Sequence, residues 1–289
     1  MTVKRQLSTV NRQQNMNIAI IGCGYVGCAI AKYWQQNPNL IVTATTTTPE
    51  RVSQLQKLAN KVIVTQGNDL EKIVNVLENQ DFVLLSVGAK GADLYESAYI
   101  DTAKTLVSAL QQNSTVKQVI YTGSYSVYGD RNGDWVDEET PPMPKSRNGE
   151  ILKETEDILL SASSNKLSVC IWRLGGIYGP GRELVKIFSR VPGTTRPGDG
   201  SDITNWIHLD DIVGAIEFVR QHPLQGIYNL VDDAHLPSKI LLDTLLAQHN
   251  LPKVIWDATV SSNRPYNAKV SNQKIKQAGY QLIHPQIIF

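Results

Sequence analysis

The segment that most constrains how this chain folds is the glycine turn GCGYVG. It follows the apolar run Asn17–Ile21 and leads into the helical pattern Cys28–Gln36. Gly22 allows a tight turn, Gly24 lets the backbone approach a phosphate, and Gly27 lets the helix pack closely on the strand. The free N–H groups and the positive dipole end of that helix face the turn, so the segment predicts a site for the pyrophosphate of a dinucleotide. The alternative is a doubly wound fold that keeps this turn without the ligand.

The charge balance argues against a nucleic-acid or membrane-surface partner. The 289 residues include 28 basic and 27 acidic side chains, a net charge of +1. Such a balance creates no strong field over the surface. Apolar residues occur in short runs, all well below the roughly 20 residues that a membrane-spanning helix needs. The length suits one α/β domain with a smaller appendage.

The amino terminus and the cysteines predict a cytoplasmic protein. Residues 1–15 are polar and lack the apolar core of a secretory signal, so we expect a disordered tail there. Cys23, Cys28 and Cys170 lack the spacing of a metal site and cannot all pair with one another. We therefore expect buried thiols in a reducing compartment, and no metal.

Strand-like and helical patterns alternate along the first two thirds of the chain. This alternation predicts a Rossmann-type, doubly wound parallel sheet of the α/β class. Functional loops should follow the strands, because ligands of such sheets bind at the carboxyl ends of the strands. The predicted strands are Asn17–Ile21, Leu40–Thr45, Lys61–Val64, Phe82–Val87, Gln118–Thr122 and Val169–Leu174. The predicted helices are Cys28–Gln36, Pro49–Leu58, Leu70–Glu78, Ala98–Gln111 and Gly149–Ala162.

The pattern changes after about residue 180, where glycine and proline become frequent. We expect a small C-terminal lobe that binds the substrate, made of residues 181–203 and 233–289. The nucleotide-binding domain should comprise residues 16–180 with a return segment at 204–232, which contains the strand–helix block Trp206–Arg220.

The residues after the second predicted strand favour NADP over NAD. An NAD site usually has an acidic residue about 20 positions after the glycine turn, where it bonds the ribose 2′-hydroxyl. This stretch instead contains Thr46 and, further on, Arg51, while Glu50 is expected to begin the next helix. A hydroxyl and a guanidinium suit the 2′-phosphate of NADP. Alternatively, Thr46 and Arg51 only cap and solvate that helix.

Several motifs follow one another in an order that resembles the order of motifs in one enzyme family. They are YTGSYSVYG at Tyr121–Gly129, and the segments Gly67–Leu70, Trp172–Pro180, Trp206–Asp211 and Tyr228–Leu230. With these motifs the chain resembles the extended short-chain dehydrogenases/reductases, the NAD(P)-dependent epimerase/dehydratase family, over about residues 16–275. The resemblance implies a dinucleotide site. Its residues would be Gly22, Gly24, Tyr25, Val26, Gly27, Thr46, Arg51, Asp69, Val87, Gly88 and Lys153.

Members of that family act through a serine or threonine, a tyrosine and a lysine, the last two spaced as YxxxK on one helical face. The lysine lowers the pKa of the phenol and holds the nicotinamide ribose. The resemblance places Ser124 at the serine position and Lys153 at the lysine position, but Gly149 stands at the tyrosine position. This departure argues against the standard alcohol–ketone step and leaves dinucleotide binding intact.

Other tyrosines lie in loops that follow strands, where nicotinamide and substrate should meet. Tyr128 is the first candidate for a substitute proton donor because its motif puts it beside Ser124; Tyr125 and Tyr178 are further candidates. The alternative for each is a packed ring whose hydroxyl bonds a backbone group. Ser124 can equally be a turn residue, and Lys153 a solvated lysine on a charged helix face.

Two other residues are expected to have structural roles. His208 stands at the end of a predicted strand and should cap the following helix or pack against it. Arg173 lies inside an apolar strand, so its charge needs a buried partner or a ligand.

Two functions fit these residues. The first is an NADP-dependent oxidoreductase, epimerase or dehydratase that acts on a small hydroxyl- or carbonyl-bearing metabolite, with nucleotide sugars among the options and Ser124 orienting the reacting oxygen. The second is a catalytically impaired NADP-binding sensor or regulatory module, which Gly149 favours. Pairing of helices between two copies would give a homodimer and is compatible with both functions.

Overall fold

The computed structural model describes residues 15–89, 91–112 and 115–289. Seven strands form one parallel sheet in the order β11-β7-β5-β4-β1-β2-β3. The strand order reverses beside β1 (Met16–Ile21), which pairs with β2 (Leu40–Thr46) on one side and β4 (Phe82–Leu85) on the other. The other strands are β3 (Lys61–Val64), β5 (Gln118–Ser124), β7 (Ser168–Leu174) and β11 (Gly226–Leu230). This topology confirms the predicted Rossmann-type α/β fold. Of the predicted tail, all but Asn15 lies outside the described residues.

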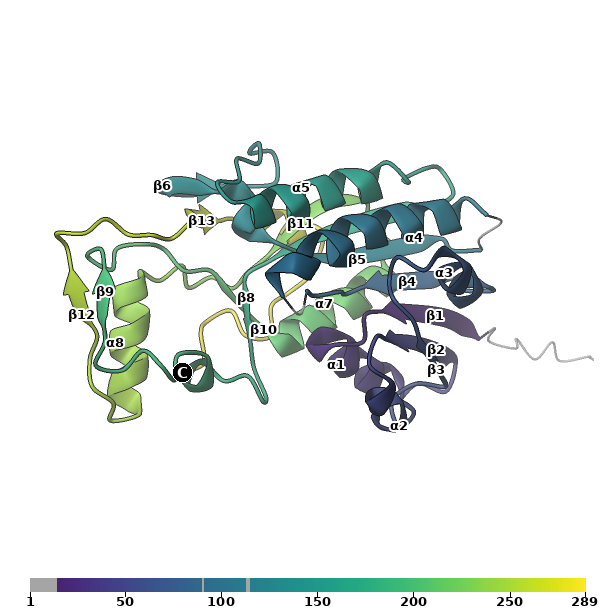
Figure 1. Cartoon of the computed structure of the whole chain (residues 1–289), viewed down its shortest axis with the longest axis horizontal. Coiled ribbons are helices and arrows are strands. Elements are labelled where there is room, and N and C mark those ends of the chain that lie inside the picture. Colours follow the sequence, from purple (N-terminus) through teal and green to yellow (C-terminus); the bar gives the residue numbers. More distant parts are fainter. Residues whose placement is uncertain (1–14, 90, 113–114) are drawn as a thin grey trace, which may run out of the picture.

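Helices cover both faces of this sheet (Figure 1). On one face lie α3 (Leu70–Leu77), α4 (Thr102–Leu110) and α5 (Arg147–Leu160); on the other lie α1 (Tyr25–Trp34) and α7 (Leu209–Gln221). Alternate residues of a strand point to opposite faces. In β4, Phe82 and Leu84 belong to the core under α1 and α7, whereas Val83 and Leu85 belong to the core under α3 and α4. Two apolar cores therefore hold the strand ends in place.

The helix after the glycine turn begins earlier than predicted. α1 starts at Tyr25, directly after its N-cap residue Gly24, and not at Cys28. The prediction relied on apolar periodicity, but the helical hydrogen bonds begin at the turn itself, where the N–H of Cys28 donates to the carbonyl of Gly24 at 2.9 Å. The amino terminus of α1 therefore adjoins the turn directly, as an anion site requires.

Two other predicted helices begin with irregular turns. The helix predicted at Pro49–Leu58 is a 3-10 turn, Pro49–Arg51, followed by α2 (Val52–Leu55). The helix predicted at Ala98–Gln111 begins with a π-helical turn, Ser97–Asp101, before α4. Both irregular turns contribute residues to the pocket described below.

Shorter elements lie outside the main sheet. They are β6 (Asp130–Val136) paired with β13 (Asn267–Val270), β8 (Gly176–Tyr178) paired with β10 (Trp206–His208), β9 (Thr195–Pro197) paired with β12 (Ile255–Asp257), α6 (Leu184–Ile187), α8 (Ser238–Gln248) and α9 (Gln273–Gln277). We call α6, β9, α8 and β12 the lobe; it extends to the left in Figure 1. Within the described residues, no helix combines the length and apolarity needed to cross a bilayer.

Arg173 has the buried partner that its position in an apolar strand requires. Its Nε lies 3.1 and 3.2 Å from the two carboxylate oxygens of Glu156, and its Nη2 lies 2.7 Å from Oε2. Both side chains are 2% exposed. The guanidinium also lies 4.7 Å from the centre of the Tyr128 ring. This ion pair joins β7 to α5 inside the protein.

His208 caps α7, in agreement with its predicted structural role. Its Nδ1 accepts the N–H of Asp210 at 3.2 Å. His284 approaches the carboxylate of Asp210, with Nε2 3.3 Å from Oδ2. Among the described residues, His208, Asp210 and His284 are the group whose donor atoms lie close enough to share a metal ion. The capping bond already uses the Nδ1 lone pair of His208, so we assign this group a structural role.

Candidate functional site

A pocket opens at the carboxyl ends of β1, β2 and β4, in front of the amino terminus of α1. Its walls come from the glycine turn, the segment after β2, the turn before α3 and the loop after β4. These residues are Gly22–Gly24, Thr46–Thr48, Arg51, Gln66–Asn68, Ser86–Ala89, Leu94, Ser97, Ala98 and Thr102. We call it the dinucleotide pocket. It lies where a parallel sheet of this topology binds its ligands.

Gly22 and Gly24 shape the turn in different ways. Gly22 has a φ of +85°, and a Cβ added there would lie 2.6 Å from the carbonyl oxygen of Ser86. A Cβ added at Gly24 would meet no heavy atom within 4 Å, so the space beside Gly24 is open. The turn is held by Thr45, whose Oγ1 accepts the N–H of Gly22 and whose carbonyl accepts the N–H of Cys23, both at 3.0 Å. Open space beside a helix amino terminus fits a phosphate group.

The residues predicted to contact the dinucleotide divide into two groups. Gly22, Gly24, Thr46, Arg51, Val87 and Gly88 line the pocket. Tyr25, Val26, Gly27 and Asp69 are not among the lining residues. Tyr25 donates its hydroxyl to the carbonyl of Pro180 at 3.0 Å, and a Cβ at Gly27 would lie 3.1 Å from the carbonyl oxygen of Gly22. Asp69 accepts the N–H of Lys72 at 3.2 Å and so caps α3, while the neighbouring Gly67 and Asn68 line the pocket.

The part of the pocket that follows β2 carries hydroxyl groups and a guanidinium. The described residues that line the pocket include no acidic side chain. Thr46 Oγ1 accepts the N–H of Thr48 at 3.2 Å. Arg51 Nη2 lies 3.3 Å from Sγ of Cys28, on the first turn of α1. The Arg51 guanidinium is therefore held at the pocket wall by a cysteine.

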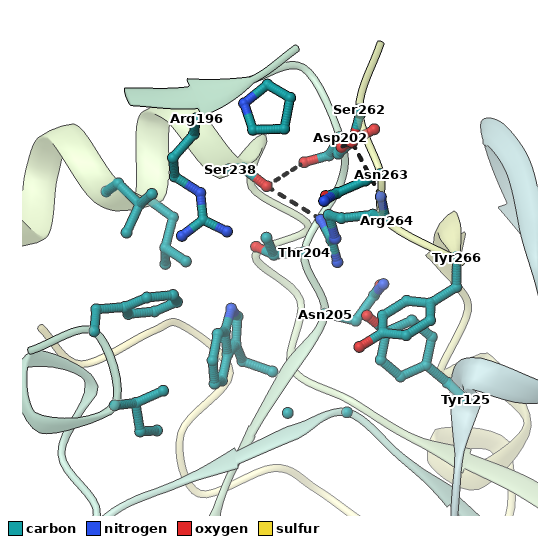
Figure 2. Close-up of a pocket in the computed structure, with 18 of the residues that line it drawn as sticks. Tyr125, Arg196, Asp202, Thr204, Asn205, Ser238, Ser262, Asn263, Arg264 and Tyr266 are labelled. Atoms are coloured by element: carbon teal, nitrogen blue, oxygen red, sulfur yellow. Dashed lines mark hydrogen bonds between the residues drawn. The ribbon is translucent and has the colours of Figure 1, made fainter. Parts of the chain in front are cut away.

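A second cavity lies between the main sheet and the lobe (Figure 2). We call it the lobe cavity. Its apolar wall consists of Ile187, Phe188, Trp206, Leu241, Leu242 and Trp256. Arg196 points into it, and Arg264 is fixed at its wall by donating to the carbonyl of Ile203 at 3.0 Å and to Oγ of Ser238 at 3.1 Å. An apolar wall with two guanidinium groups can hold a ring and an anionic group together.

A third cavity surrounds Gly149 at the start of α5. Its lining residues are Tyr95, Tyr99, Thr122–Ser124, Ser126, Ser146, Asn148, Gly149, Leu152, Pro265 and Tyr266. Ser124 and Tyr266 line both this cavity and the lobe cavity. A Cβ added at Gly149 would lie 2.7 Å from Cβ of Pro144. The position that the family resemblance assigns to tyrosine is therefore closed to a side chain by a neighbouring proline.

The three cavities adjoin one another along the ends of β4 and β5. Thr122, in the wall of the Gly149 cavity, donates its hydroxyl to Oγ of Ser86 in the dinucleotide pocket at 3.1 Å. Ser124 lies two residues further along β5. Its Oγ accepts the N–H of Ser126 at 3.2 Å and lies 3.1 Å from Oγ of Ser126. Ser124 thus stabilises a turn and faces two cavities at once.

Tyr128 does not reach any of these cavities. Its side chain is completely buried, and its hydroxyl donates to Oδ1 of Asn229 at 2.8 Å. Burial raises the pKa of Tyr128 to about 12. This geometry argues against the hypothesis that Tyr128 is the proton donor, because its buried hydroxyl is held by Asn229 and lines none of the three cavities. Tyr178 is also buried, and its hydroxyl accepts the N–H of Ile288 at 3.1 Å.

Lys153 lies one turn after Gly149 in α5 but is not among the residues that line the three cavities. Its Nζ pairs with the carboxylate of Asp157, and its side chain is 41% exposed. Contact between Lys153 and a dinucleotide stays a prediction, and it requires Lys153 to leave Asp157.

Sequence reasoning missed Tyr266, which shares both cavity walls with Ser124. The two residues are far apart in the chain, and no motif spacing connects them. They meet because β13, which begins one residue after Tyr266, pairs with β6. The Tyr266 ring also packs edge to face on Tyr125, with the ring centres 5.2 Å apart. Tyr125 lines the lobe cavity, and burial raises its pKa to about 12.

Comparison with known proteins bears on the family of this chain. Residues 18–230 match the model of the NAD dependent epimerase/dehydratase family. Protein YeeZ of Escherichia coli strain K12 is 33% identical in an alignment of 233 residues that covers 75% of this chain and 78% of YeeZ. The dTDP-glucose 4,6-dehydratase of Streptomyces griseus is 30% identical in an alignment of 168 residues that covers 54% of this chain and 50% of the dehydratase.

Solved structures with low sequence identity share the fold. MoeE5 in complex with UDP-glucuronic acid and NAD superposes with a TM-score of 0.75 at 20% identity, covering 93% of this chain and 94% of MoeE5. UDP-glucuronic acid 4-epimerase from Bacillus cereus, in complex with UDP-glucuronic acid and NAD, has a TM-score of 0.73 at 18% identity, covering 91% of this chain and 92% of the epimerase. The segment that matches the family model, residues 18–230, includes the glycine turn and Ser124. It also includes every strand of the main sheet, except for the first two residues of β1. The chain therefore belongs to the NAD dependent epimerase/dehydratase family.

Proposed function

We propose that this protein is an NADP-dependent oxidoreductase, epimerase or dehydratase whose substrate is a small hydroxyl- or carbonyl-bearing metabolite, with nucleotide sugars as the leading class. The observation that carries the proposal is the row of three cavities, with Ser124 in the walls of two and Thr122 bonded to the wall of the third. The nucleotide-sugar names of the dehydratase relative and of the MoeE5 ligand support the substrate class.

The residues of the dinucleotide pocket have distinct tasks in this proposal. A nicotinamide dinucleotide bound there supplies hydride transfer. The backbone between Gly22 and Gly24 would bind the pyrophosphate at the amino terminus of α1. Thr46 and Arg51 would bind the 2′-phosphate, and Lys153 would bind the nicotinamide ribose.

The lobe cavity would bind the substrate, and the lobe, which lies within the predicted substrate-binding residues 181–203 and 233–289, would cover it. Arg196 and Arg264 provide guanidinium groups for a phosphate. Trp206 and Trp256 provide aromatic surface for a base or a sugar ring. Ser124, at the end of the cavity nearest the dinucleotide pocket, would donate a hydrogen bond to the reacting oxygen.

Tyr266 is the proton donor that we propose in place of the missing tyrosine. It is partly exposed and lines both cavities that Ser124 lines, whereas Tyr125, Tyr128 and Tyr178 are buried. The guanidinium of Arg264 lies 5.4 Å from the centre of the Tyr266 ring. A cation over an aromatic ring attracts the ring, so Arg264 helps to hold Tyr266 in place at the cavity wall.

The first test is to titrate the protein with NADPH and with NADH while following nicotinamide fluorescence and Tm. Binding of NADPH, followed by turnover of a UDP- or dTDP-sugar, is the expected result. Binding without turnover of any hydroxyl or carbonyl substrate would favour the sensor, with Gly149 as its cause. If neither dinucleotide bound at millimolar concentration, both functions would be excluded.

Replacing Arg51 with methionine should weaken NADPH binding by about 10- to 100-fold and leave NADH binding unchanged, because only NADPH carries the 2′-phosphate that a charged hydrogen bond would hold. The dissociation constants of both dinucleotides, measured by fluorescence, check this. Lys57→Met is the matched control, since it removes an exposed charge near α2 that does not line the pocket. Equal weakening of NADPH and NADH would contradict the assignment.

Once a substrate has been found, Ser124→Ala and Tyr266→Phe should each lower kcat by about 10²- to 10⁴-fold, the usual contribution of a positioned proton-transfer group. Tyr128→Phe should retain kcat and lower Tm, because it leaves Oδ1 of Asn229 without its buried donor. Steady-state rates and thermal melts on the same preparations separate the two effects. Full activity in Tyr266→Phe would disprove the role of Tyr266.

A further inference from the structure

Two cysteines at the glycine turn lie close enough to react with each other. Cys23 lies within the turn and lines the dinucleotide pocket, and Cys28 lies in the first part of α1. Their sulfur atoms are 3.9 Å apart, and Sγ of Cys28 also lies 3.5 Å from the carbonyl oxygen of Cys23. A disulfide requires a separation of about 2.05 Å, so the two sulfurs need to approach by roughly 2 Å.

The surroundings give the two thiols different reactivity. The hydrogen bond from Cys23 and the nearby Arg51 guanidinium lower the pKa of Cys28 to about 6, although burial opposes them. The same hydrogen bond, together with burial, raises the pKa of Cys23. Cys28 is partly exposed, whereas Cys23 is 1% exposed. A partly exposed thiol of lowered pKa beside a second, buried thiol is the arrangement of a reactive cysteine and its resolving partner.

We propose that Cys23 and Cys28 are an oxidisable thiol pair that forms a disulfide with hydroperoxides and thereby switches the dinucleotide pocket. The Cys28 thiolate attacks one peroxide oxygen, the O–O bond breaks, and the other oxygen leaves as water or an alcohol after taking up a proton. Cys28 is then a sulfenic acid. The Cys23 sulfur attacks the Cys28 sulfur and loses its proton, the S–O bond breaks, and a water molecule leaves. Two electrons pass from the two sulfurs to the peroxide.

The disulfide should weaken dinucleotide binding for two reasons. Cys23 lies between Gly22 and Gly24, so moving its side chain toward α1 displaces the turn that Thr45 holds. The disulfide also ties up the Cys28 sulfur that Arg51 contacts at the pocket wall. By reciprocity, a bound dinucleotide should slow oxidation of the pair, because coupling between two sites acts in both directions. This step rests on the proposed dinucleotide pocket; formation of the disulfide does not.

The test treats the reduced full-length protein with hydrogen peroxide, quenches it, and measures both the mass of the peptide that contains both cysteines and the dissociation constant of NADPH. We expect the peptide to lose two hydrogens and the dissociation constant to rise about tenfold, with both changes reversed by dithiothreitol. Saturating NADPH should slow disulfide formation at least fivefold, a factor at the low end of typical coupling. Cys170→Ala, which removes a buried thiol in β7, should behave like the parent protein. Cys28→Ser should lose both responses.

Different results would overturn different parts of the proposal. A peptide that keeps its mass, or a Cys28→Ser variant whose NADPH affinity still falls after peroxide, would exclude the thiol pair. A disulfide that leaves the NADPH dissociation constant unchanged would exclude the switch. If the reduced protein failed to bind NADPH, the proposed function and the switch would both be wrong, while the peptide mass would still decide whether the pair forms.

Discussion

Replacing Glu156 with glutamine is expected to lower the free energy of unfolding by about 3–5 kcal/mol, because it leaves the Arg173 guanidinium buried without a counter-charge. The substitution keeps the shape of the side chain and removes only its charge. The two side chains are 2% exposed, so water cannot replace the lost partner. Since domains are typically stable by about 5–15 kcal/mol, such a loss would leave the protein marginally stable. The midpoint of urea unfolding, at an unchanged slope, measures the effect.

Glu154→Gln on the same helix is the matched control. Glu154 lies 4.0 Å from Lys104 and its side chain is 49% exposed. Loss of an exposed ion pair costs about 0–1 kcal/mol, so Glu154→Gln should unfold close to the parent protein. A double variant, Glu156→Leu with Arg173→Met, should recover much of the stability because it removes both charges together. Similar midpoints for Glu156→Gln and Glu154→Gln would show that the Arg173 charge is compensated in some other way.

Replacing Gly24 with alanine is expected to leave folding nearly unchanged and to weaken NADPH binding by roughly 100-fold or more, equivalent to losing one or two charged hydrogen bonds. The added methyl group would meet no protein atom within 4 Å, but it would occupy the space where a phosphate approaches the turn. Its effect on the free energy of unfolding should be about 1 kcal/mol or less. Tm and an NADPH titration on the same sample check both parts.

Gly22→Ala, in the same turn, should affect folding, whereas Gly24→Ala should affect binding. At position 22 the backbone has a φ of +85°, and the methyl group would lie 2.6 Å from the carbonyl oxygen of Ser86. This substitution should lower Tm, because an alanine in this conformation is strained and the β4 end must move. If Gly24→Ala bound NADPH as tightly as the parent protein, the pyrophosphate would not lie against the glycine turn.

Features that depend on neighbouring residues in the chain could be predicted from the sequence. The glycine turn, the alternation of strands and helices, and the parallel sheet follow from periodicity and local turn chemistry. Contacts between distant segments could not be predicted in this way. Tyr266 lies near Ser124 because β13 pairs with β6. No residue pattern near Tyr266 or Ser124 predicts that pairing.

The burial of Glu156 was indicated by its helical spacing, but the charged residues around it indicated the opposite. It lies in the charged run Lys153–Asp157, which reads as a solvent-exposed face. Its spacing from Leu152 and Leu159 places it on the buried face of the helix, and all three are buried. The need of Arg173 for a partner was predicted, but choosing Glu156 required the packing of α5 on β7. Lys153, in the same charged run, pairs with Asp157 one turn later on the helix.

The contact between position 149 and Pro144 also restricts how this site can change over evolutionary time. A tyrosine at position 149 would bring a Cβ to 2.7 Å from a rigid proline ring, so the substitution would be disfavoured while Pro144 remains. Pro144 would have to shift or be replaced, and replacing it alone adds no proton donor. The two positions are therefore epistatic, and the order of substitution matters. The tyrosine that the family resemblance assigns to position 149 would therefore meet a steric cost while Pro144 remains, which favours the retention of whatever chemistry the other tyrosines support.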